Sequence, residues 1–388
     1  MYRKFTADQI FTGYHLLAEP VVLITDIFGA IIEIVNSDDA GDEIETLPGL
    51  LTPGFVNAHC HLELSHLKAA IPEKTGLVNF VQQVMSNRNS ATELKQEAMQ
   101  KAEAEMYDGG IVAVGDICNT ADSIPVKQQS KLLWHNFIEV SGFIGAAAQK
   151  RWDDSQLVFE QFRARLANHQ TTFSPHAPYS VSKKLFQLLN EKTNSQLITI
   201  HNQECAAEDE LYKSKSGRFL ELYQNFGIDI ISFEPTGQSS FKSWLPYFNN
   251  GQSIISVHNS FTNEEDIDFA TKPISYCLCV NANQYIEQKN PPIDMLMRKD
   301  CQIILGTDSY ASNHQLSILA EIKTIQRETN HAVPLTEMLQ WATINGANAL
   351  QLQQSVGSFE KGKKPGIVLI EGLDDVQITE ASVAKRIL

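Results

Sequence analysis

Five residues that can bind or activate a metal ion stand directly after apolar, β-branched segments. His59 and His61 form an H-x-H pair, and His201, His258 and Asp308 follow three later segments. Residues i and i+2 of a β-strand point to one face, so the H-x-H pair can share a cation. Neutral imidazoles with a carboxylate suit zinc or ferrous iron and leave a position for water. We therefore predict one divalent metal ion held by His59, His61, His201 and Asp308.

Two further groups could move protons beside such a metal. Glu204 comes three residues after His201, where a carboxyl group can take a proton from the attacking water and pass it to a leaving group. From its position alone, Glu204 could equally be an exposed loop residue. His258 could ligate the metal, or it could polarise the attacking water and relay its proton. We predict catalytic roles for Glu204, His258 and Asp308.

Several other residues are candidates for substrate contacts. His176 lies in the proline-flanked turn from Ser174 to Ser180, which follows an apolar segment. Glu63 continues the alternation of the H-x-H pair, so we expect it to face the same pocket. The weaker candidates for polar contacts to a substrate are Asn283, Ser309 and Asn313.

Some chemically active side chains have plainer interpretations. Cys277 and Cys279 lie on one face of an apolar segment and are expected in the core. Most of the remaining histidines are expected at the surface or in caps, namely His66, His135, His169, His314 and His331. Neither a P-loop nor a G-x-G-x-x-G motif follows a predicted strand, which argues against nucleotide phosphate chemistry and Rossmann cofactors.

The elements that would position these residues alternate between short strands and longer amphipathic helices. Helical spacing is clearest over residues 96–107 and 335–350. Eight βα units of this size close a (β/α)₈ TIM barrel, whose chemistry lies at the carboxyl ends of its strands. The eight expected strands are 54–58, 110–115, 132–139, 171–174, 197–200, 253–257, 274–280 and 302–306.

The two ends of the chain have a different pattern. Residues 20–25 and 30–35 are short β-rich runs, and the tail from Gly357 returns to turn residues followed by a strand. We predict that residues 1–52 and 351–388 form a small composite β-sandwich domain, beside a barrel of residues 53–350. The fold class is therefore α/β.

Composition limits the partners. The 388 residues include 31 Lys plus Arg against 46 Asp plus Glu, a net charge of −15 that disfavours nucleic acid. Apolar runs fall short of the ~20 residues that span a membrane, and no signal peptide is recognisable. Six scattered cysteines fit a reducing cytoplasm. We expect a small-molecule substrate, no nucleic-acid or membrane partner, and possible homo-oligomers.

The motifs together resemble the amidohydrolase superfamily, in its chlorohydrolase and aminohydrolase branch of cytosine, guanine and adenosine-type deaminases. The matching segments are Pro53 to His61, Ser174 to Ser180, His201 to Glu204, His258, Leu305 to Ser309 and Gly357 to Lys363. The resemblance implies a barrel with a β-sandwich built from both termini, and the metal and catalytic roles given above. A lysine is missing at the end of the fourth strand, so the resemblance favours a single metal.

The substrate implied by the resemblance is an aminated purine-type nucleoside. The strings His61-Leu-Glu-Leu-Ser65 and Ser174 to Ser180 are similar to those of 6-aminodeoxyfutalosine, S-adenosylhomocysteine and adenosine deaminases. Hydrolytic deamination would release ammonia, with Glu63 on the sugar or purine. Two segments depart from the branch: Cys279 to Asn283 lacks a proline, and His258-Asn-Ser replaces a histidine-cysteine pair. Hydrolysis of another C–N or C–Cl bond is one alternative, and a non-catalytic scaffold is another.

Overall fold

Eight parallel strands form the centre of the computed structural model, which describes residues 2–374 and 377–388. They are β5 (Phe55–Cys60), β6 (Ile111–Cys118), β7 (Leu133–Val140), β8 (Gln170–Pro175), β9 (Leu197–Asn202), β10 (Ser253–His258), β11 (Ile274–Leu278) and β12 (Gln302–Leu305). Each of the eight predicted strands is present. The predicted α/β barrel is therefore confirmed.

The barrel consists of two four-stranded sheets, ordered β5-β6-β7-β8 and β12-β11-β10-β9. At one seam, Cys60 and Asp308 form a parallel β-bridge. At the other, the His201 amide donates a 2.9 Å hydrogen bond to the His176 carbonyl. Predicted metal-site residues thus lie at both seams, where the two half-barrels meet.

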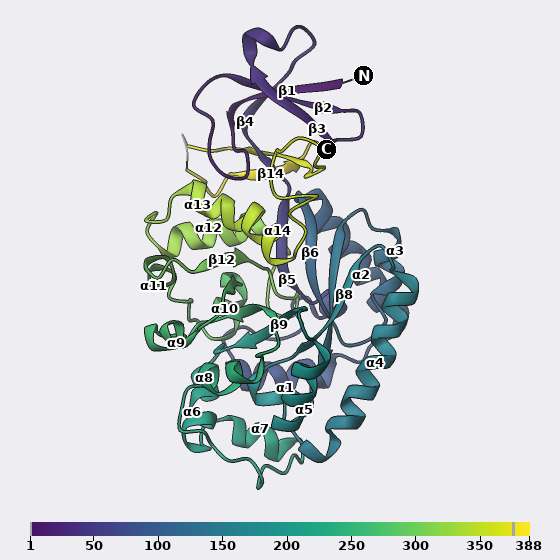
Figure 1. Cartoon of the computed structure of the whole chain (residues 1–388), viewed down its shortest axis with the longest axis vertical. Coiled ribbons are helices and arrows are strands. Elements are labelled where there is room, and N and C mark those ends of the chain that lie inside the picture. The colour runs from purple at the N-terminus through teal and green to yellow at the C-terminus, as the bar shows by residue number, and fades with distance from the viewer. Residues whose placement is uncertain (1, 375–376) are drawn as a thin grey trace.

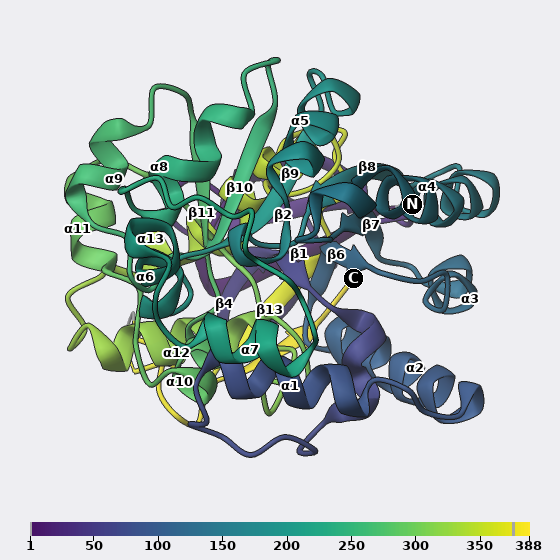
Figure 2. The same cartoon turned by 90° about the horizontal axis from the view of Figure 1, so that it is seen from below.

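Helices surround the strands (Figure 2). They are α1 (Leu77–Asn87), α2 (Thr92–Asp108), α3 (Ile124–Gln129), α4 (Ala148–Arg165), α5 (Lys183–Lys192), α6 (Ala206–Ser214), α7 (Phe219–Asn225), α8 (Ser240–Trp244), α9 (Glu264–Phe269), α10 (Val280–Ile286), α11 (Ile293–Arg298), α12 (Ile318–Glu328), α13 (Leu335–Gln340) and α14 (Gly346–Ala349). The predicted helix 335–350 holds α13 and α14, joined by a π-helical turn. Within the described ranges, none of the helices is both long and apolar enough to cross a membrane.

The barrel strands are buried on both faces, which explains their nearly continuous apolar sequences. One face fills the barrel interior with residues such as Val56, Phe137 and Ile255. The other face packs against the helices, where Trp134 and Phe162 are buried. The side-chain alternation along each strand therefore separates an inner core from an outer one.

The two ends of the chain meet in one mixed sheet (Figure 1). Its order is β14 (Val383–Arg386), β13 (Ile367–Glu371), β4 (Glu45–Pro53), β1 (Tyr2–Ile10), β2 (Val21–Asp26) and β3 (Ile31–Asn36). These strands are continuous in a single sheet, with a small core around Phe5, Leu51 and Leu369. The pairing of the two termini is as expected, while the domain boundaries 1–52, 53–350 and 351–388 stay a prediction.

This terminal sheet and the predicted site lie at opposite ends of the molecule. Strand β4 passes directly into β5 through Gly54, so the terminal sheet lies at the amino ends of the barrel strands. The carboxyl ends face the other way, toward α1 and α7, which Figure 1 shows at the far end from the sheet. The predicted catalytic residues follow those carboxyl ends.

Candidate metal centre and active site

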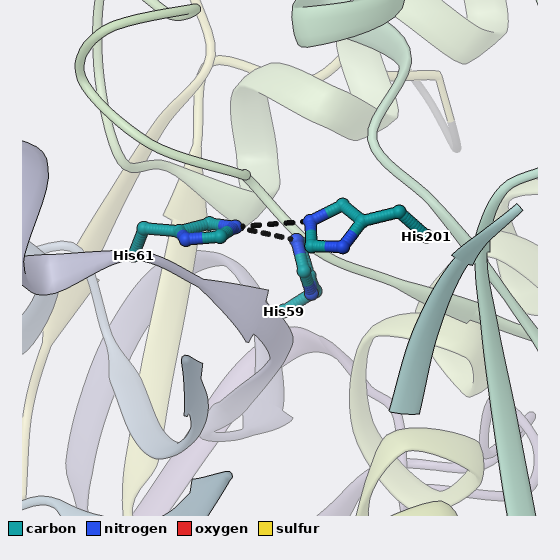
Figure 3. Close-up of side chains that lie close together, drawn as sticks. All are labelled: His59, His61 and His201. Atoms are coloured by element: carbon teal, nitrogen blue, oxygen red, sulfur yellow. Dashed lines mark hydrogen bonds between the residues drawn. The ribbon is translucent and has the colours of Figure 1, made fainter. Parts of the chain in front are cut away.

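Three histidines from two strands point their ring nitrogens at one another (Figure 3). The Nε2 atom of His61 lies 3.2 Å from Nε2 of His59 and 3.1 Å from Nε2 of His201. His59 belongs to β5, His61 follows it directly, and His201 is near the end of β9. All three are buried. Three converging nitrogens at this spacing can coordinate one cation.

Asp308 brings an oxygen to the same point. Its Oδ1 atom is 3.6 Å from Nε2 of His59 and 3.4 Å from Nε2 of His61. Asp308 and His258 both have left-handed backbone conformations, with φ of 55° and 70°. Such conformations are costly for residues other than glycine and gather at functional sites. Here they occur where the two strand ends turn into the barrel mouth.

Burial keeps the imidazole rings neutral, which is the form that binds a metal cation. It lowers the pKa of His61 to about 3, although Asp308 opposes the shift. It also lowers the pKa of His59 and takes that of His201 well below its usual value. Burial alone would raise the pKa of Asp308, but the His59 hydrogen bond and the electrostatic interaction with the His61 ring lower that pKa instead. Neutral nitrogens and an ionised carboxylate form the donor set of a divalent metal site.

Outer hydrogen bonds orient two of these histidines. Nδ1 of His201 donates a 2.7 Å hydrogen bond to the His176 carbonyl, which leaves its Nε2 lone pair free. Nδ1 of His258 lies 2.8 Å from Oδ1 of Asn283, whose Nδ2 donates to Ser260 Oγ. Such partners fix the tautomer and the ring orientation of a metal-site histidine.

Glu204 and His258 form the proton-transfer side of the site. Nε2 of His258 and Oε2 of Glu204 lie 3.6 Å apart, and both side chains are buried. Burial raises the pKa of Glu204 well above its usual value, and the negative charges of Asp308 and Glu287 raise it further. A carboxyl group with a raised pKa can both accept and donate a proton near neutral pH. Glu204 is therefore not the exposed loop residue that its sequence position also allowed.

A cavity of about 600 Å³ opens over these groups. Its inner wall includes the predicted residues His61, His176, His201, Glu204, His258, Asp308 and Ser309. Its outer wall is largely apolar and comes from α1, α7 and the segment around α4, with Leu77, Phe80, Phe143, Val158, Leu222 and Tyr223. The volume is in the range of small-molecule sites.

Three predicted substrate residues lie behind the cavity wall. Glu63 accepts hydrogen bonds from the Asn119 amide at 3.2 Å and the Thr120 amide at 2.8 Å. Asn283 supports His258, as described above. Asn313 donates to the Thr307 carbonyl at 2.9 Å. Each of these side chains makes a hydrogen bond to a neighbouring loop or residue, and a substrate contact by any of them stays a prediction.

The structure also shows groups that the sequence analysis missed or misplaced. Glu139, near the end of β7, and Asn119, after β6, line the cavity. Both residues could have been predicted from their positions at the ends of apolar segments, which is the same signal that identified the histidines. His135 is an exception to the expectation that most of the remaining histidines lie at the surface or in caps. It is buried, stacks on Phe137 and has a 3.0 Å hydrogen bond with Thr172 Oγ1.

Comparison with known proteins decides the family. The model of the "Amidohydrolase family" matches residues 50–386. The chain belongs to the amidohydrolase family. This amidohydrolase is a metal-dependent hydrolase of carbon–nitrogen bonds, as the sequence predicts, with a buried, histidine-rich metal site.

Individual relatives are distant but cover most of the amidohydrolase chain. An adenosine deaminase of Helicobacter pylori (strain ATCC 700392 / 26695) is 26% identical over 337 residues, covering 81% of this chain and 77% of the relative. The crystal structure of H. pylori aminofutalosine deaminase with methylthio-coformycin matches with a TM-score of 0.81 at 22% identity, covering 97% of this chain and 93% of that one. A Xanthomonas campestris adenosine deaminase with bound zinc matches with a TM-score of 0.73 at 22% identity, covering 95% and 84%.

Proposed function

We propose that this amidohydrolase deaminates an aminated purine-type nucleoside by hydrolysis and releases ammonia. The observation that carries the proposal is the pairing of Glu204 with His258 beside the converging histidines, at the inner end of a cavity. We infer that His59, His61, His201 and Asp308 hold the metal. Zinc is the metal we favour, because the donor set is rich in nitrogen and a relative of the same fold binds zinc.

The residues of the chain would divide the proton transfers as follows. A bound divalent metal supplies a Lewis acid that makes water nucleophilic near neutral pH. Glu204 accepts a proton from the attacking water and delivers it to the ring nitrogen beside the amine-bearing carbon. His258 and Asp308 hold the remaining proton of that water and relay it to the amine, which then leaves as ammonia. His176 and Ser309, on the cavity wall, would contact the substrate.

The cavity favours a nucleoside with a substituent over a free base. A nucleobase alone is small for about 600 Å³, and the outer wall offers apolar side chains that a base at the metal would not reach. An adenosine carrying an extended group, as in 6-aminodeoxyfutalosine or S-adenosylhomocysteine, would cover that wall. The names of the adenosine and aminofutalosine deaminase relatives agree with this class.

Ammonia release from a panel of compounds tests the proposal. Zinc-loaded protein would be given adenosine, S-adenosylhomocysteine, 6-aminodeoxyfutalosine, guanine and cytosine, and chloride release from a chlorinated triazine would be measured in parallel as the C–Cl control. We expect turnover of the purine nucleosides, fastest with an extended substituent. Turnover of the triazine alone, or of no aminated compound, would overturn the proposal.

A further inference from the structure

A lysine is fully buried outside the metal centre. Lys127, on α3, donates a 2.5 Å hydrogen bond to Oδ2 of Asp116 and a 2.8 Å hydrogen bond to Oδ1 of Asn136. Its Nζ also lies 3.2 Å from Sγ of Cys118. Neither Lys127 nor Asp116 exposes any side-chain surface to solvent.

The surroundings of this ion pair are apolar. Its partners on β6 and β7 belong to the face that packs against the helices, where the rings of Trp134 and Phe162 lie 4.9 and 5.1 Å from Lys127 Nζ. Burial opposes the charge on Lys127, but the neighbouring Asp116 carboxyl group outweighs this effect, so the pKa of Lys127 is raised. The raised pKa favours the protonated form of Lys127 within the outer core of the barrel.

Stability alone does not account for such a pair. Buried ion pairs often contribute nothing to stability relative to apolar residues of the same size, because both charges lose their hydration. The attraction between the two charges offsets this loss of hydration only if the geometry of the pair is excellent and its other hydrogen-bonding groups are satisfied. We therefore expect a structural role of the pair in the groups that Asp116 contacts.

The carboxylate oxygen of Asp116 that does not contact Lys127 binds the loop after β5. Oδ1 accepts a 2.8 Å hydrogen bond from the amide of Leu62, the residue between His61 and Glu63. Leu62 begins a short 3₁₀ helix, Leu62–Leu67, whose residue Leu64 reaches the cavity. One oxygen of Asp116 is thus fixed by a buried cation, and the other fixes the backbone next to His61.

The same loop is tied a second time. Glu63 accepts hydrogen bonds from the Asn119 and Thr120 amides, which follow β6. Asn119 lines the cavity. The loops after β5 and β6 are therefore linked to each other, and Asp116 anchors the start of the first loop to β6.

We propose that Lys127 and Asp116 are positioning residues, which hold the backbone at Leu62 so that His61 faces His59 and His201. The pair acts through the loop and touches neither metal nor substrate. This inference rests on the proposed metal role of His61. It does not depend on which compound is deaminated.

Two double variants separate positioning from stability. Lys127→Met with Asp116→Leu replaces the pair by apolar groups and removes the acceptor for the Leu62 amide. Lys127→Met with Asp116→Asn removes the charges but keeps an oxygen acceptor. Phe162→Leu is the matched control, because it removes apolar volume from the same cluster and no hydrogen bond. Zinc affinity would be measured by competition with a chromophoric chelator, together with the melting temperature of the zinc-free protein.

We expect the variant with Lys127→Met and Asp116→Leu to bind zinc roughly 10- to 100-fold more weakly, as is usual when an outer partner of a metal ligand is lost. The zinc affinity of the variant with Lys127→Met and Asp116→Asn should stay close to that of the wild type, as should the zinc affinity of Phe162→Leu. Equal zinc affinities in both double variants would overturn the proposal. The proposal would also be overturned if zinc affinity fell across the variants only in proportion to their melting temperatures.

Hydrogen exchange gives a second measurement if the variant with Lys127→Met and Asp116→Leu does not fold. In Lys127→Met alone, the amides of Leu62–Leu67 should exchange faster than in Phe162→Leu. Unchanged protection there would also overturn the proposal. None of these readouts needs a substrate, so a protein that binds zinc but releases no ammonia would refute the proposed function alone.

Discussion

Single residues divide the work of the proposed centre between holding a cation and moving protons. His59, His61 and His201 offer neutral nitrogens because burial lowers the pKa of each ring. Glu204 has the opposite shift, since burial raises its pKa. The same loss of hydration thus prepares both kinds of group.

Replacing Glu204 should remove proton transfer and leave the metal. Glu204→Gln keeps the size of the side chain, so we expect normal metal content and ammonia release reduced by about 10²- to 10⁴-fold. Metal analysis and an ammonia assay on one preparation measure both. Glu221→Gln, an exposed position on α7, is the matched control. Near-normal turnover in Glu204→Gln would remove it from the proton-transfer role.

Asn283 should matter through His258. Asn283→Ala removes the 2.8 Å partner of His258 Nδ1, and a loss of about 10- to 100-fold in kcat is expected, since the ring is then free to turn. Asn283→Asp keeps an oxygen at Nδ1 and should recover part of the activity. Steady-state kinetics with saturating zinc measure the difference. If the two variants were equally impaired, support of His258 would not be the role of Asn283.

Secondary-structure elements decide which sequence predictions succeed. Parallel barrel strands are apolar on both faces, so all eight strands and the residues at their ends could be found from the sequence. Glu63 was predicted by continuing the alternation of β5 beyond Cys60. The strand ends there and a 3₁₀ helix begins, so the period of two no longer applies.

The buried polar residues could not be predicted in this way. Lys127 and His135 are buried because partners on neighbouring strands satisfy them, namely Asp116 and Thr172. The register of β6, β7 and β8 brings these residues together, and a single sequence gives no measure of that register.

The closure of the barrel between β12 and β5 needs a residue without a side chain. A Cβ atom on Gly306 would lie 2.8 Å from Cβ of His59 and 2.9 Å from Sγ of Cys277, closer than side chains tolerate. Gly306→Ala should push His59 away and weaken zinc binding by about 10-fold or more. Gly145→Ala meets no atom within 4 Å and is the control. Chelator competition measures both, and equal affinities would show that the close approach is not needed.

At the scale of the whole molecule, the terminal sheet and the barrel are joined through Arg386. Its Nε atom donates to the Tyr107 carbonyl at 2.8 Å, and its Nη2 atom donates to the Ile111 carbonyl. Its guanidinium group also lies 4.0 Å from the Tyr107 ring. A residue of β14 thereby binds the end of α2 and the start of β6, far from the catalytic end.

Removing this link should lower stability without changing catalysis. Arg386→Ala removes the donor of two partly buried hydrogen bonds, and we expect a loss of about 1–3 kcal/mol in the free energy of unfolding. Urea unfolding followed by circular dichroism measures it, and kcat should be unchanged. Its exposed neighbour gives the control, Lys385→Ala, for which little change is expected. Comparable losses in both variants would argue against a specific link.

We propose above that four side chains from distant parts of the sequence hold one metal ion at the barrel mouth. Metal analysis of the purified protein and of Asp308→Ala tests it most directly. We expect one divalent ion per chain in the wild type and almost none in Asp308→Ala, with activity lost in parallel. A wild type that binds no metal when zinc is supplied, or full occupancy in Asp308→Ala, would contradict it.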